Sequence, residues 1–202
     1  MTAIPTTIPH GRTARRLEWA HLPPALRGLI EERCGSPVVA AASQEAGFTP
    51  GFASVLTCED SSRHFVKAAS SSAQRMFATS YREEARKLRE LPQATPAPAL
   101  AWLIDDDWVV LGLEYVASRQ PARPWCADDL ARCLDALEVV ADVLTPAPST
   151  LALDSVAEEF ATWPDFWTTV RESPPLPLVA EHGAEAAALA ASFADVVSRP
   201  GP

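Results

Sequence analysis

The sequence has no apolar run long enough to span a membrane, and its N-terminus lacks the apolar segment of a signal peptide. It also lacks clusters of lysine and arginine, and its 202 residues carry a formal net charge of −9. Proteins that bind nucleic acid use such clusters to contact the phosphate backbone. We therefore expect a cytoplasmic protein with no membrane and no nucleic-acid partner.

The sequence has no Cys-x-x-Cys pair, although it contains Cys34, Cys58, Cys126 and Cys133. Cysteine and histidine ligands of a metal usually come at tighter spacing than these residues show. We expect buried free thiols in a reducing compartment and no metal site. The three aspartates over 105–107 allow a metal site or a solvated turn, and the turn is favoured because no further ligand lies at a suitable spacing.

The composition indicates a folded chain, because 48% of the residues are hydrophobic. Periodicity and turn residues predict an α+β fold. The acidic charge would suit a cationic substrate, but it is equally typical of an ordinary well-dissolved protein. The expected helices lie over 22–34, 70–89, 127–144, 153–161 and 178–197, and the expected strands over 37–43, 52–58, 64–69, 100–104 and 108–113.

The stretch from Gly47 to Lys67 combines a glycine-bearing turn with two strands. Glycine lets backbone N–H groups approach a phosphate closely, and a lysine on the neighbouring strand adds a positive charge. Glu84, on the helix that follows, lies next to an apolar stripe and could pair with Lys67. The alternative is a partner on its own helix, such as Lys87, which would contribute only a few tenths of a kcal/mol.

Three segments carry a resemblance to a known family: Gly-Phe-Thr-Pro-Gly-Phe-Ala (47–53), Phe-Val-Lys-Ala-Ala (65–69) and Tyr-Arg-Glu-Glu-Ala (81–85). With Glu-Tyr-Val (114–116) and Pro-Trp (124–125), they resemble the aminoglycoside phosphotransferase family, in particular its uncharacterised bacterial branch, over about residues 17 to 197. The resemblance implies a kinase-like N-lobe, with an antiparallel sheet of about five strands plus one helix, followed by a mostly helical partial C-lobe.

The resemblance also implies roles for particular residues in binding ATP. Lys67 would contact the α- and β-phosphates, and Glu84 would hold Lys67 in place. The loop would cover the phosphates with backbone N–H groups of Thr49, Pro50, Gly51 and Phe52, although proline itself has no N–H. Main-chain groups of Glu114 and Val116 would bond the adenine edge at the hinge between lobes. The family usually has glycine near position 118, and Ser118 here predicts a stiffer linker.

The catalytic segment of the family has no counterpart in this sequence. His182-Gly183 is followed by Ala-Glu instead of Asp, and there is no asparagine anywhere in the chain. We therefore assign no catalytic residue. Mg²⁺ binding is expected only in the presence of the C-lobe residues that this sequence lacks. The expected domains are a flexible arm (1–21), a nucleotide-binding lobe with the hinge (22–116) and a helical start of the C-lobe (117–202), truncated before the catalytic loop.

Two functions follow from this pattern. The first is a kinase-like small-molecule phosphotransferase that is inactive as this chain and binds nucleotide at most; a complete enzyme would phosphorylate a small hydroxyl-bearing substrate. The second is a non-catalytic scaffold that binds a partner, with self-association through uncovered helices. The resemblance leaves open whether the chain is a fragment, a frameshift product or a degenerate relative.

Overall fold

The computed structural model describes residues 16–44, 50–119, 121, 124–159, 188 and 192. In chain order the elements are η1 (Trp19–His21), α1 (Pro24–Cys34), β1 (Val38–Ser43), β2 (Phe52–Cys58), β3 (Arg63–Ser70), α2 (Arg75–Glu90), β4 (Leu100–Asp105), β5 (Trp108–Glu114), α3 (Ala127–Leu144), η2 (Ser149–Leu151) and α4 (Val156–Glu159).

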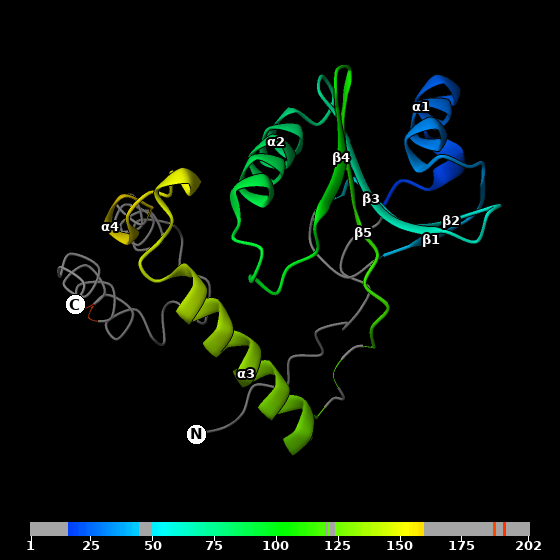
Figure 1. The fold of residues 1–202 in the computed structure, drawn as a ribbon. Helices are drawn as coiled ribbons and strands as arrows, with labels where there is room; N and C mark the ends of the chain where they lie inside the picture. The colour runs from blue at the N-terminus through cyan, green and yellow to red at the C-terminus, as the bar shows by residue number, and fades with distance from the viewer. Residues whose placement is uncertain are drawn as a thin grey trace. The chain divides into compact units, whose positions relative to one another are not determined.

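The structure has an α+β fold built on one five-stranded antiparallel sheet (Figure 1). The strand order is β1-β2-β3-β5-β4, so β3 lies in the middle and pairs with β2 and β5. The five strands fall where the sequence predicts them, within one or two residues at each end. This confirms the predicted fold class at the level of an antiparallel sheet combined with helices.

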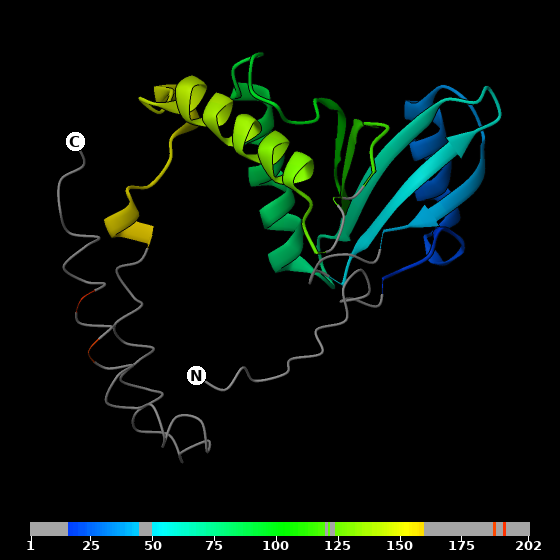
Figure 2. The same ribbon diagram turned by 90° about the horizontal axis from the view of Figure 1, so that it is seen from below.

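The helices α1 and α2 cover opposite faces of the sheet, as both views show (Figures 1 and 2). On the α1 face, Leu26 and Ile30 belong to a buried cluster with Val66 of β3. On the α2 face, Tyr81 and Ala85 belong to a second cluster with sheet residues. Side chains alternate along a strand, so β3 contributes to both clusters. Lys67 therefore faces α2, and His64 faces α1.

The ends of the helices show where the sequence prediction holds and where it is wrong. Helix α1 begins at Pro24 and ends before Gly35, whose φ of 81° is left-handed and suits glycine. The helix expected over 70–89 begins only at Arg75, and Gln74 occupies its cap position. The hydroxyl of Ser70 accepts a bond from the Ala73 N–H (3.2 Å), so it stabilises the turn before the helix.

The end of the segment 1–21, which was expected to form an arm, packs against the sheet. Residues 1–15 lie outside the described residues, but Leu17 and Trp19 pack against the α1-face cluster. The Trp19 ring lies 6.2 Å from that of Phe52, measured between centroids. These apolar side chains bury surface on the sheet, which fixes the chain ahead of α1.

The chain divides into two compact units, Met1–Leu151 and Ala152–Pro202. In the second unit the helix expected over 153–161 is described only as α4, and the helix expected over 178–197 lies outside the described residues apart from positions 188 and 192. Within the described part of the chain, no helix is both long and apolar enough to cross a membrane.

Candidate functional site

Lys67 and Glu84 form an ion pair between β3 and α2. The Lys67 ammonium lies 2.7 Å from Oε1 and 2.9 Å from Oε2 of Glu84, so it donates to both carboxylate oxygens. The structure thus confirms the predicted pairing of these two side chains. The alternative, in which Glu84 pairs along its own helix, is not what the structure shows; that pattern occurs instead between Glu83 and Arg86.

The position of the pair follows from the local structure of both elements. Lys67 points toward α2 because strand residues alternate between faces, and Glu84 directly precedes the buried Ala85 on the helix. The two side chains are only 25% and 33% exposed. The ammonium is therefore held in one direction but remains open to solvent, and so to an anionic ligand.

Gly51 brings the loop before β2 close to this pair. A Cβ added at Gly51 would lie 3.0 Å from the Ala68 carbonyl oxygen and 3.2 Å from the Tyr81 hydroxyl, so glycine lets the backbone come this close without displacing either group. The Tyr81 ring in turn lies 5.7 Å from the Lys67 ammonium. Burial raises the pKa of Tyr81, so the hydroxyl stays protonated and uncharged at neutral pH.

The other predicted loop residues differ in how well the structure places them. Thr49 lies outside the described residues, and Pro50 is exposed beside Gly51. Phe52 is fully buried, and its ring is part of the α1-face cluster. Its side chain therefore cannot cover a ligand at the Lys67 face, and any contribution of Phe52 is limited to its backbone.

The predicted hinge residues leave the sheet at the end of β5. The Glu114 N–H donates to the Ala99 carbonyl (2.8 Å), and the Glu114 carboxylate accepts from the Ala99 N–H (3.2 Å). The N–H of Glu114 is thus used by the sheet, which leaves its carbonyl and the main chain of exposed Val116 as the groups that could meet a ligand.

A pocket borders the ion pair on the α2 side. It has a volume of about 470 Å³ and is lined by Thr79, Ser80, Glu83, Glu84, Lys87, Leu88 and Leu91. Among the predicted site residues that the structure describes, only Glu84 lines it. The pocket therefore gives the carboxylate a second open side, away from Lys67.

The three aspartates begin with the last residue of β4 and lead into the turn before β5, as predicted, and they also hold α2. Arg82 donates to both carboxylate oxygens of Asp105 (2.9 and 3.1 Å), and this hydrogen bonding raises the pKa of Arg82. The Ser71 hydroxyl donates to the Asp106 carbonyl (2.7 Å). The turn thus anchors the start of the helix that carries Glu84.

Cys34, Cys58 and His64 come together on the α1 face, which sequence spacing did not predict. Their sulfur and nitrogen atoms all lie within 4.8 Å of one another. Burial, together with the neighbouring Cys58, raises the pKa of Cys34 to about 12. The expectation of four buried thiols holds for Cys58 alone, since Cys34 and Cys133 are half-buried and Cys126 is exposed.

No residue pattern alone could have found this cluster, because each member comes from a different element. The role of the Lys67–Glu84 pair likewise depends on its geometry and surroundings.

Comparison of the chain with protein-family models, with curated proteins and with solved structures gives no match.

Proposed function

We propose that residues 22–116 form a nucleotide-binding lobe of the aminoglycoside phosphotransferase type, and that this lobe holds ATP. The observation that carries the proposal is the bidentate contact between Lys67 and Glu84 (2.7 and 2.9 Å). In kinase-like enzymes a lysine on the third strand pairs with a glutamate on the following helix and contacts the phosphates. Here Lys67 lies on β3 and Glu84 on α2, the next helix.

The order of groups along β3 also supports this proposal. Gly51 lies against Ala68, Lys67 comes next, and His64 pairs with Glu114 at the start of the hinge. Lys67 lies three positions after His64 along the strand, which corresponds to about 10 Å. A nucleotide lying along the α2 face would thus place its base at the hinge, its first phosphates at Lys67 and the end of its phosphate chain at the Gly51 loop.

The residues fit ATP binding better than phosphoryl transfer. The ammonium of Lys67 supplies the positive charge, and backbone N–H groups near Gly51 supply hydrogen-bond donors. The sequence contains neither His-Gly-Asp nor any asparagine, the residues that would position the acceptor hydroxyl and bind the metal ion. We therefore propose nucleotide holding without turnover for these 202 residues, and assign no acceptor substrate.

Calorimetric titration with ATP, AMP and adenosine tests the proposal. We expect one ATP per chain, with weaker binding of AMP and weaker still of adenosine, because Lys67 recognises phosphate charge. Equal affinity for ATP and adenosine would show that the lysine does not contact phosphate. Absence of ATP binding, or sustained ATP hydrolysis by the purified chain, would contradict the proposal.

A second candidate function is partner binding by a scaffold, and one observation favours it. Helix α3 carries three exposed leucines on one face: Leu130, Leu134 and Leu137 are 47%, 50% and 62% exposed. Leucines at this spacing form a continuous apolar stripe. We propose that this stripe mediates self-association of the chain, independently of the Lys67 face.

Sedimentation velocity tests the role of the leucine stripe. We expect a concentration-dependent dimer for the wild type and a weakening of at least about tenfold in Leu137→Glu, because a buried leucine contributes about 1.5 kcal/mol or more. Ala136→Glu introduces the same charge on another face of α3 and is expected to leave the dimer intact. A wild-type chain that stays monomeric at all concentrations would rule out this candidate.

A further inference from the structure

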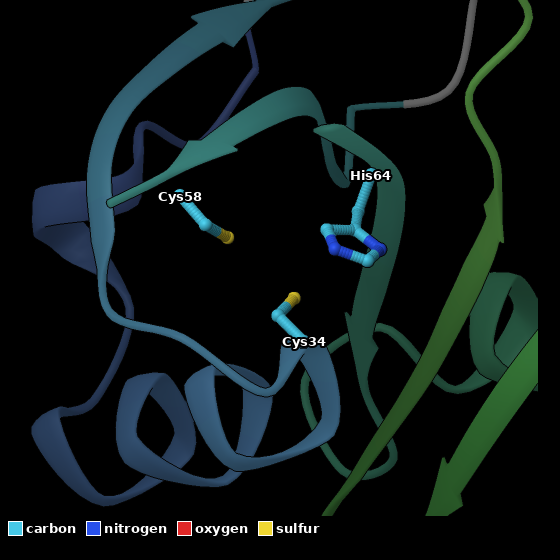
Figure 3. Close-up of side chains that lie close together, drawn as sticks. All are labelled: Cys34, Cys58 and His64. Atoms are coloured by element: carbon cyan, nitrogen blue, oxygen red, sulfur yellow. The ribbon is translucent and has the colours of Figure 1, made fainter. Parts of the chain in front are cut away.

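Two thiols and an imidazole converge on the α1 face of the sheet, which is opposite the face that carries Lys67. Figure 3 shows the side chains of Cys34, Cys58 and His64 turned toward a common point. Cys34 is the last residue of α1, Cys58 the last of β2, and His64 the second of β3. We propose that these three residues form a binding site for one zinc ion, distinct from the nucleotide site.

The distances suit a metal ion better than a sulfur–sulfur bond. The three ligand atoms lie within 4.8 Å of one another. In a tetrahedral zinc site with Zn–S bonds of about 2.3 Å, the ligand atoms are roughly 3.5 to 3.8 Å apart. Each pair therefore exceeds the required spacing by at most about 1.3 Å, a change that side-chain rotations supply. A disulfide would need the two sulfurs at about 2.05 Å.

The backbone around the site is held in place without a metal. The Asp60 N–H donates to the Ser36 hydroxyl (3.2 Å), and the Glu59 N–H donates to the Pro37 carbonyl (2.9 Å). These bonds connect the β2–β3 turn to the segment that joins α1 to β1. The left-handed Gly35 turns that segment back beside Cys58. The two cysteines are therefore presented at a fixed separation before any ion arrives.

The histidine is oriented by polar neighbours that also favour a cation. Its Nε2 lies 3.2 Å from the Ser62 hydroxyl, and that hydroxyl donates to the Asp60 carboxylate (2.6 Å). Metal-binding histidines are commonly held by such hydrogen-bonded carboxylates. Asp60 and Glu31 also place negative charge near the thiols. The site thus combines soft ligands with an anionic environment.

Zinc is the ion that this ligand set suits best among divalent metals. Two thiolates and one neutral imidazole give a Cys₂His set, and a water molecule completes four-coordination. Binding converts two thiols to thiolates and releases two protons to solvent, so the ion and its ligands together are neutral. Neither thiol changes its oxidation state, and no other reactant is required.

Cobalt substitution of the reduced full-length chain tests the site. We expect one Co²⁺ per chain, with thiolate-to-cobalt absorption in the near ultraviolet and intense visible bands of a four-coordinate ion, both lost on adding Zn²⁺. Cys34→Ser and His64→Gln are expected to weaken Zn²⁺ binding by roughly 100-fold. Both residues are half-buried, so these variants should keep the wild-type circular dichroism spectrum.

The double variant Cys126→Ser/Cys133→Ser is the matched control, because it removes the thiol that precedes α3 and the one within it and leaves the cluster intact. It is expected to give the wild-type cobalt spectrum and stoichiometry. The proposal is overturned if the wild type binds no Zn²⁺, if folded Cys34→Ser keeps the wild-type affinity and the full intensity of the thiolate bands, or if the control variant loses these bands. The cobalt experiment does not involve ATP, so the result of this experiment is independent of the nucleotide proposal.

Discussion

Replacing Lys67 with methionine is expected to weaken ATP binding by about 10- to 150-fold. Methionine keeps the length and apolar stem of the side chain but removes the charge. A hydrogen bond to a charged group contributes about 1.5–3 kcal/mol, which corresponds to this range of affinities. Because Lys67 would contact the phosphates, the loss should be large for ATP and small for adenosine. Calorimetric titration of both ligands measures the difference.

Lys87→Met is the matched control, since Lys67 and Lys87 are the only lysines in the sequence. Lys87 is exposed on α2, where a change of charge should leave ATP affinity within about twofold. Glu84→Gln removes the charge that fixes Lys67 and is expected to give an intermediate loss. Similar losses in Lys67→Met and Lys87→Met would show that only the overall charge matters.

The Lys67→Met variant should have nearly the same free energy of unfolding as the wild type. Lys67 and Glu84 are 25% and 33% exposed, so water screens much of their attraction and can solvate Glu84 when the lysine is gone. Pairs of this kind contribute about 0–1 kcal/mol to the free energy of unfolding. A large loss of ATP affinity with an unchanged unfolding curve would thus separate a binding role for Lys67 from a structural one.

Local sequence patterns predicted the elements that lead to the Lys67–Glu84 pair. Proline at the start of α1 and glycine after it mark the helix ends, and alternation along β3 puts Lys67 on the face of Phe65. The apolar stripe of α2 then orients the helix, so Glu84 at its edge faces the strand. These steps depend on residues close in sequence and place Glu84 beside the strand. The choice of Lys67 instead of Lys87 as its partner came from the family resemblance, because local patterns left both open.

Contacts between distant elements were not predictable in this way. Cys34, Cys58 and His64 meet because the α1–β1 segment is bonded to the β2–β3 turn, and no spacing rule contains that information. The position of Trp102 over Gly112 depends in the same way on the register of β4 against β5. In the sequence, Gly112 appears only as an unremarkable position within an apolar strand.

Replacing Gly112 with alanine is expected to lower the free energy of unfolding by about 3 kcal/mol. A Cβ at this position would lie 2.1 to 2.4 Å from three atoms of the Trp102 ring. The ring packs against the α1-face cluster, so it cannot move aside without losing buried contacts. Overpacking usually costs about 1–3 kcal/mol, and displacing a packed tryptophan adds to that. Urea unfolding followed by circular dichroism measures the change.

Two further variants separate this clash from the general effect of adding a methyl group. Gly28→Ala makes the same change inside α1, where nothing lies within 4 Å of the added Cβ, and it should stabilise the chain by about 1 kcal/mol. In the double variant Trp102→Leu/Gly112→Ala the smaller side chain leaves room for the methyl group. We therefore expect Gly112→Ala to cost less in the Trp102→Leu background than in the wild type. Equal costs in both backgrounds would mean that the β4–β5 register, and not the tryptophan ring, requires glycine.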